Sequence, residues 1–175
     1  RARWEAISAG TRSSLVSIGE AQLGKEWPAL PAAVFLEFKR TGNRSRYEGL
    51  RNTRRGRLQS LIFAELAEGK GRFVDEIVNG IWATCEETYW GVPAHVGVQR
   101  AGTGLPDAAE PTVDLFAADT AATLSWIHYL MAERLDEVSP LVSQRIIREI
   151  KAKVLTPCFE RDDFWWMGFG QDRAM

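Results

Sequence analysis

The chain has 175 residues, of which 45% are hydrophobic and 26% charged, and its formal net charge is -1. This composition is typical of one globular domain with a substantial core. A near-neutral total excludes the broad basic footprint of a nucleic-acid-binding protein and offers no charge attraction to an anionic membrane. No apolar run approaches the roughly 18 residues of a membrane helix, so we expect neither nucleic acid nor a membrane as a partner.

Helical periodicity runs through most of the chain, whereas no stretch shows the sustained alternation of a strand. The first helices are predicted at about 3–8, at 12–23 and from Ala32 to near Gly42, and the second of them ends near Gly24. A longer helix is predicted at 45–68, because Ser45 and Glu48 have the spacing of a capping box.

No Lys or Arg occurs between Arg72 and Arg100. The helix predicted at 72–88 carries two adjacent apolar stripes, the first of Phe73, Ile77 and Ile81 and the second of Val74, Val78, Trp82 and Cys85. A stripe this wide is typical of an inner helix with neighbours on more than one side. The helix leads into CEETYWGVPAH (85–95), where we expect water to reach the aromatic residues. Residues 96–111 are rich in Gly, Pro and small side chains and predict a long loop.

Two more helices are predicted, at 112–137 and from Ser139 to about Leu155, with Ser139 as N-cap and Pro140 in the first helical position. A second aromatic exit loop, TPCFERDDFWWMGFG, begins at Thr156. Helical hairpins whose alternate helices line an interior would place both exit loops at one end. We therefore expect an all-α fold, either a bundle or solenoid or, more specifically, part of a toroid of helical hairpins.

The two exit loops are dense in aromatic residues. Sugar rings have flat C–H faces, for which an aromatic side chain with a polar edge is a matching platform. Aromatics in two adjacent loops would suit an extended cleft. Packing into the core on the loop side is the alternative, and composition alone favours it. The residues concerned are Tyr89, Trp90, Trp165, Trp166 and Phe169.

Polar residues near these loops suggest several chemistries. His95 could act as a general base, a charge neutraliser or a hydrogen-bond donor, or it could simply anchor its loop. Glycoside hydrolysis needs two carboxyl groups across the bond, so one acid from Glu86–Glu87 would have to face one from Asp162–Asp163. Six arginines lie in Arg44–Arg57. They could bind an anionic glycan, but we expect a solvated helix face.

Cys85 and Cys158 are the only cysteines, too few for a disulfide framework. With His95 and His128 they amount to four potential zinc ligands, but no two of the four have ligand-like spacing. We expect no metal and no cofactor. The thiols are predicted to be small and buried, with a single bridge between them as the alternative.

Three segments in order resemble the N-terminal toroid of the heparinase II/III-like polysaccharide lyases. They are GIWATCEETYWGVPAH (80–95), DLFAADTAATLSWIHYLM (114–131) and the last helix leading into FWWMGFGQDRAM (164–175). The resemblance covers at least Glu48–Met175. It implies that 1–175 is a single partial domain, part of an incomplete (α/α) toroid, with the remainder and a β-sandwich outside the chain. The absence of an initiator Met and of a signal-peptide pattern agrees with an internal piece of a longer protein.

The resemblance also implies a reaction, β-elimination on a polysaccharide that contains uronic acid. A base removes the proton beside the carboxyl group, an acid protonates the leaving oxygen, and a third group neutralises the carboxylate as carbanion character builds up. No residue here matches the family's catalytic motifs, which we expect beyond residue 175. The implied partners are an acidic polysaccharide or oligosaccharide and the rest of the parent chain, and the implied location is periplasmic or secreted. The implied substrate-binding residues are Glu87, Trp90, His95, Trp165, Trp166 and Gln171.

Two other functions stay open. One is a toroidal glycoside hydrolase that pairs Glu87 with Asp162 or Asp163. The other is a non-catalytic helical-repeat module that binds protein or glycan, with the loop aromatics packed inside. An incomplete toroid would also expose the apolar flank of its last helix, which predicts poor solubility in isolation.

Overall fold

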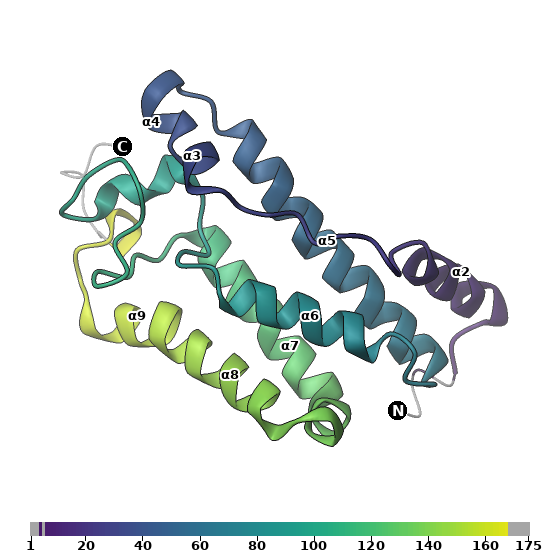
Figure 1. The fold of residues 1–175 in the computed structure, drawn as a ribbon. Coiled ribbons are helices and arrows are strands. Elements are labelled where there is room, and N and C mark those ends of the chain that lie inside the picture. The colour runs from purple at the N-terminus through teal and green to yellow at the C-terminus, as the bar shows by residue number, and fades with distance from the viewer. Residues whose placement is uncertain (1–3, 5, 168–175) are drawn as a thin grey trace.

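A computed structural model describes residue 4 and residues 6–167 (Figure 1). Over this range the chain forms helices, turns and loops without a strand, which confirms the all-α prediction. The helices in chain order are α2 (Ala9–Glu20), α3 (Ala32–Phe35), α4 (Glu37–Thr41), α5 (Ser45–Glu68), α6 (Val74–Cys85), the 3-10 helix η1 (Pro93–Val98), α7 (Leu115–Val138), α8 (Pro140–Ile150), the π-helical turn η2 (Lys151–Leu155), α9 (Thr156–Glu160) and the 3-10 helix η3 (Trp165–Met167).

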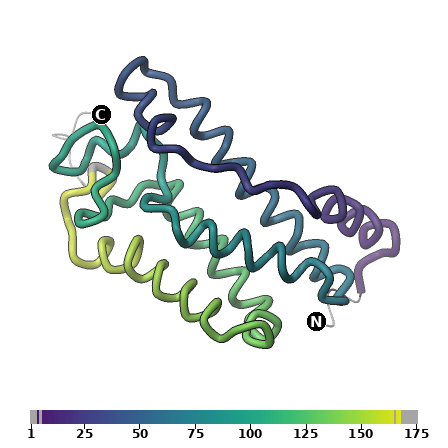
Figure 2. The backbone as a smooth tube through the Cα atoms, in the orientation of Figure 1, coloured from purple at the N-terminus to yellow at the C-terminus, as the bar shows by residue number. Residues whose placement is uncertain are grey.

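Helices α5 to α8 run alternately up and down the molecule, and α2 lies along α5 (Figure 2). Helix α6 packs against α5, α7 and α8, so it is the inner helix that its wide apolar stripe predicts. Because α6 and α8 run in the same direction, the segments that follow them lie at one end of the molecule, as predicted (Figure 1). That these helices form part of a toroid stays a prediction.

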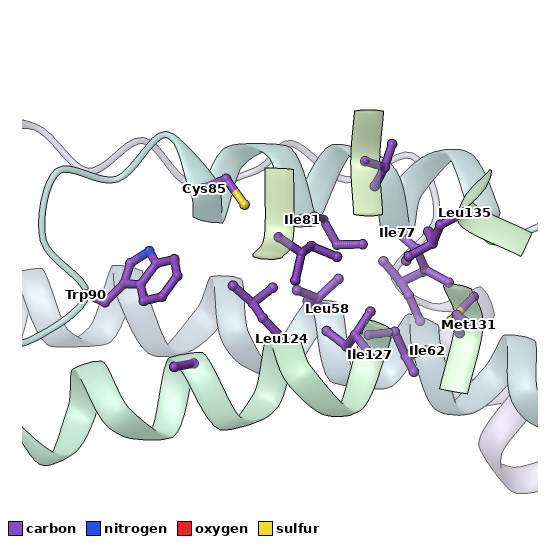
Figure 3. Packing of buried hydrophobic residues seen from close by; sticks show 14 of the residues in the cluster. Leu58, Ile62, Ile77, Ile81, Cys85, Trp90, Leu124, Ile127, Met131 and Leu135 are labelled. Carbon is purple, nitrogen blue, oxygen red and sulfur yellow. The ribbon is translucent and has the colours of Figure 1, made fainter. Parts of the chain in front are cut away.

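The core lies between α5, α6, α7 and α8 (Figure 3). Ile77 and Ile81 of α6 are fully buried and meet apolar side chains of α5 and α7. The second predicted stripe of α6 is only partly buried, since Trp82 is 37% exposed and the Arg145 guanidinium lies 5.3 Å from its ring centroid. The core side chains labelled in Figure 3 include Leu58, Ile62, Leu124, Ile127, Met131 and Leu135.

The start of α5 is correctly placed, but the predicted capping box is wrong. Ser45 lies inside the helix, and its backbone N–H donates to Oδ1 of Asn43 at 3.1 Å. Glu48 accepts from Nε of Arg44 at 2.5 Å instead of reaching back to the backbone. A guanidinium is a stronger partner for a carboxylate than a backbone N–H, which accounts for the change.

Helix α8 starts as predicted, since Oγ of Ser139 accepts from the Leu141 N–H at 3.3 Å and Pro140 occupies the first position. Its predicted end near Leu155 is too early. The helix continues through the π-helical turn η2 into α9. Pro157 has no N–H to donate to the carbonyl of Lys153, and a locally wider turn accommodates that loss.

The α7–α8 hairpin carries apolar side chains on its outer surface. A groove of about 500 Å³ lies between α7 and the α8–α9 segment, lined by Ile147, Leu155 and Phe159. This is the exposed apolar flank that the sequence predicts. Further exposed members of this surface are Trp126, Tyr129 and Leu141.

Both cysteines are free, which agrees with the reduced thiols predicted, although Cys158 is partly exposed where burial was expected. Among the described helices, none has both the length and the apolar character needed to cross a membrane.

Candidate functional site

The first exit segment, residues 86–98, begins where α6 ends and its last carbonyl groups need partners. Lys153 supplies them from η2. Its Nζ donates to the Cys85 carbonyl at 2.7 Å and also to the Glu87 carbonyl, and it lies 3.0 Å from a carboxylate oxygen of Glu149. A cation at the negative end of a helix dipole is favourable. The first exit segment is therefore fixed to the continuation of α8.

Trp90 is buried, and the prediction that water reaches it is wrong. Its side chain is 1% exposed and lies at the end of the row of core residues (Figure 3). Nε1 of Trp90 donates to the Thr84 carbonyl at 2.8 Å, and Nζ of Lys153 lies 5.0 Å from the ring centroid. The neighbouring Tyr89 is also buried. Trp90 thus presents no face to a sugar, because it belongs to the buried core cluster and the Lys153 ammonium lies over its ring.

Glu87 is held in a buried ion-pair cluster. Oε1 accepts from Arg54 at 2.8 Å and from Arg55 at 2.9 Å, and Oε2 accepts from Arg55 at 2.5 Å. Both carboxylate oxygens of Glu87 are therefore occupied by guanidinium groups. Neither oxygen is open to a glycosidic oxygen, which one member of a glycosidase acid pair must reach.

The arginine-rich helix face is partly buried, which corrects the prediction of a solvated face. Arg51, Arg55 and Arg57 are 3%, 8% and 4% exposed, whereas Arg46 remains largely exposed as expected. Arg51 donates to the Trp90 carbonyl from Nη2 at 2.9 Å and from Nε at 3.1 Å. It also donates to the Phe116 carbonyl at 3.0 Å and to Oγ1 of Thr120 at 2.8 Å. Arg51 thus ties α5 to the first exit segment and to the start of α7.

His95 reaches the N-terminus of α7, where it meets Asp114. Oδ1 of Asp114 caps the helix by accepting from the Ala117 N–H at 2.7 Å, and Oδ2 lies 2.8 Å from Nδ1 of His95. The Asp114 side chain is 2% exposed and that of His95 is 24% exposed. A buried carboxylate that accepts from Nδ1–H orients the imidazole and leaves its Nε2 lone pair for another group. This is the geometry of a general base or of a hydrogen-bonding partner for substrate.

The second exit loop begins with the short helix α9, and its residues 161–167 contact the start of α7 as well. Nε1 of Trp166 donates to the Val113 carbonyl at 2.8 Å, and Trp166 stacks on Phe164 with ring centroids 5.6 Å apart. Arg161 donates to the Pro111 carbonyl at 2.9 Å. Trp166 is nevertheless 42% exposed. The two exit loops therefore converge on residues 111–114, as the hairpin arrangement predicts.

The remaining predicted residues are only partly described. The backbone of Trp165 belongs to η3, and its side chain lies outside what the structure describes. Gln171 lies outside the described residues altogether. Among residues 4 and 6–167, no cluster of three or more His, Cys, Asp or Glu side chains could hold a metal ion.

Sequence reasoning missed the residues that hold the predicted ones in place. Asp114 has a recognisable signal, because an Asp just before a long apolar-periodic helix is a typical N-cap. Lys153 and Arg51 have none, since the carbonyls of Cys85 and Trp90 to which they donate lie 39 or more positions away in the sequence. Burial and the charge of Asp114 raise the pKa of Tyr89 well above its ordinary value, so this phenol stays protonated at the same junction.

A scan against protein-family models finds no family that matches the chain, and no curated protein matches it. The likeness of the three segments to the heparinase II/III-like lyases therefore stays a prediction from the sequence.

Proposed function

We propose that the chain forms part of the substrate cleft of a polysaccharide lyase that cleaves uronic-acid-containing glycans by β-elimination. The observation that carries this proposal is the convergence of the two exit loops on the start of α7, where exposed Trp166 and the His95–Asp114 pair lie at one junction. An exposed indole offers a platform to a sugar ring. An imidazole oriented by a buried carboxylate has its Nε2 lone pair available to accept a proton or a hydrogen bond from the glycan.

The cleft wall in this proposal differs from the sequence-based one. Trp166 and His95 contact the glycan, and Trp165 and Gln171 are retained as predicted contacts. Glu87 and Trp90 do not contact the glycan. They are positioning residues whose hydrogen bonds fix the first exit segment. The resemblance of the three segments supplies the reaction, the incomplete toroid, the catalytic groups beyond residue 175 and the periplasmic or secreted location.

The hydrolase alternative is less well supported. It needs a carboxyl group on the first exit segment that can reach the glycosidic oxygen, and both oxygens of Glu87 are bound to Arg54 and Arg55. Of the two acids expected from the second loop, Asp162 and Asp163, the latter is paired with Arg161 at 2.8 Å. Both carboxylates are thus held by arginine side chains and do not face each other across an open cleft.

A non-catalytic binding module is the second candidate, and two observations favour it. Trp90 and Tyr89 pack inside, as that function predicts, and an apolar groove runs along the α7–α8 hairpin. A contiguous exposed apolar patch is typical of a surface that binds another protein segment. This module would bind its partner on the hairpin and not at the two exit loops.

The lyase proposal is tested by ultraviolet detection of unsaturated uronate. The substrates are heparan sulfate, hyaluronan, chondroitin and alginate, and a neutral glucan is the control. We expect product from a polypeptide extended beyond residue 175 and none from residues 1–175 alone. Absence of product from the extended polypeptide on every acidic glycan would contradict the proposal, and intact glycan binding in that case would favour the binding module.

A further inference from the structure

Helix α7 carries a second apolar stripe on the side that faces away from the core. The members of this outer stripe are exposed and recur every three or four residues, which places them on one face of the helix: Leu115, Ala118, Ala122, Trp126 and Tyr129. The opposite face of the same helix is buried in the core. A helix that is apolar on two opposite sides has a second surface to cover.

The outer stripe is separate from the groove between α7 and the α8–α9 segment. On the α7 side that groove is lined by Ser125 and His128, which lie on the flank of the helix turned toward α8. Successive residues of an α-helix are rotated by about 100°, so Trp126 points away from this flank. A partner that covers the outer stripe therefore leaves the groove open.

Two aromatic side chains dominate the outer stripe. Trp126 is 63% and Tyr129 is 77% exposed, and their rings contact each other edge to face with centroids 5.8 Å apart. This contact holds both rings in place before any partner binds, which lowers the entropy lost on association. Trp and Tyr are also the residue types that contribute most to protein–protein interfaces.

The outer stripe is complementary to itself when two α7 helices lie antiparallel. Its N-terminal half has the small side chains Ala118 and Ala122, and its C-terminal half has the two large rings. A two-fold axis at Ala122 would place Trp126 against the two alanines of the second copy, and Tyr129 against Leu115 of the second copy. Large side chains then pack over small ones, as close packing requires.

Charges at the end of α7 also favour the antiparallel arrangement. Glu133, Asp136 and Glu137 are exposed and follow the aromatic pair. Parallel helices would bring these acids against their own copies, which is repulsive. Antiparallel helices place the two acidic ends far apart and beside the N-terminal part of the other helix, where the helix dipole is positive. Asp119 lies at the edge of the stripe, where its carboxylate stays in contact with water.

The area of the outer stripe fits a weak dimer. An aromatic residue can bury about 150–250 Å², so the exposed parts of Trp126 and Tyr129 provide about 300 Å². With the rest of the stripe, each copy would bury roughly 400–500 Å², or about 800–1,000 Å² in total. This total lies below the standard size of stable complexes and is typical of reversible association.

We infer that two copies of this chain associate through an antiparallel contact between the outer stripes of their α7 helices, with the two-fold axis at Ala122. The inference does not rest on the lyase proposal, because the stripe contains no residue of either exit loop.

Sedimentation velocity over about 1–500 µM protein tests the association, and the sedimentation coefficient should rise toward that of a dimer within this range. Trp126→Glu should raise the dissociation constant at least about tenfold, because it places a charge in the centre of the contact. Phe159→Ser is the matched control, since Phe159 is 87% exposed but lines the groove, and it should leave the dissociation constant unchanged. Thermal melts followed by circular dichroism verify that both variants fold.

Cysteine cross-linking tests the symmetry in a Cys158→Ala background, where the remaining Cys85 is 1% exposed. A short bismaleimide should join Ala122→Cys to its own copy, because that residue lies on the two-fold axis. It should not join Glu137→Cys, whose two copies would be about 45 Å apart along the antiparallel helices.

A monomer at every concentration would overturn the inference. So would dissociation by Phe159→Ser but not by Trp126→Glu, which would assign the contact to the groove. Cross-linking of Glu137→Cys in place of Ala122→Cys would overturn the antiparallel arrangement. None of these results affects the detection of unsaturated uronate, so the two proposals fail separately.

Discussion

The two exit loops have similar aromatic sequences but different surroundings. Trp90 follows α6 and is 1% exposed, whereas Trp166 follows α9 and is 42% exposed. Each indole N–H donates to a backbone carbonyl at 2.8 Å, so local hydrogen bonding does not distinguish them. The difference comes from burial, because Trp90 belongs to the core cluster and the Lys153 ammonium lies 5.0 Å from its ring centroid. An aromatic residue after a helix is therefore a ligand platform only where no distant element covers it.

The acidic residues of the two loops show the same contrast. Glu87 has a side chain 4% exposed and two arginine partners, whereas the side chain of Asp163 is 57% exposed and pairs with Arg161, two residues away. The first loop is thus part of the core framework, and the second presents its polar groups to solvent.

The largest effect should come from truncating the two tryptophans. Trp90→Ala should lower the free energy of unfolding by about 3–5 kcal/mol, because a large buried side chain leaves a cavity. Trp166→Ala should cost less, about 2 kcal/mol, since that residue is already 42% exposed. Urea denaturation of both variants measures the difference. Equal losses of unfolding free energy in the two variants would show that the two tryptophans do not differ in how far they are buried.

A smaller difference is expected between the two acids. Glu87→Gln should lower the free energy of unfolding by about 3 kcal/mol, because it leaves buried guanidinium charge without a counter-charge. Asp163→Asn should change it by no more than about 0.5 kcal/mol, since exposed ion pairs contribute little. Thermal melts at two salt concentrations would test this. A large, salt-sensitive loss in Asp163→Asn would reverse the assignment.

The smallest effect concerns the pH dependence of stability. Burial raises the pKa of the Cys85 thiol to about 11 from 9.0, so the folded protein keeps this proton while the unfolded chain loses it. Stability conferred by the protonated thiol is then present below pH 9 and falls as pH rises toward 11, by about 1 kcal/mol between pH 8 and pH 10.

Cys85→Ala should remove this contribution to the pH dependence, and Cys158→Ala should retain it. Buried tyrosines add a similar alkaline loss that is common to both variants and therefore cancels in their comparison. The measurement is urea denaturation at pH 8 and at pH 10. Identical pH dependence in both variants would contradict the burial argument.

The all-α fold and the position of both exit loops at one end of the molecule could be predicted from the sequence. Both follow from local periodicity and short connections between helices. Ser139 and Pro140 placed the start of α8 correctly. The predictions that were wrong concern residues whose partners lie far away in the sequence. Trp90 is covered by a residue 63 positions later, and Arg55 meets Glu87 across a separation of 32. No local pattern in a single sequence encodes such pairings.

The central claim is that the junction of the two exit loops binds an acidic glycan, and its most direct test compares two exposed tryptophans. Trp166 lies at the junction, and Trp126 lies on the outer surface of α7 with 63% exposure. Affinity for heparan sulfate and hyaluronan is measured by calorimetry for Trp166→Ala and Trp126→Ala. We predict that Trp166→Ala weakens binding about tenfold and that Trp126→Ala leaves it unchanged. Unchanged binding in Trp166→Ala, or an equal loss in Trp126→Ala, would contradict the claim.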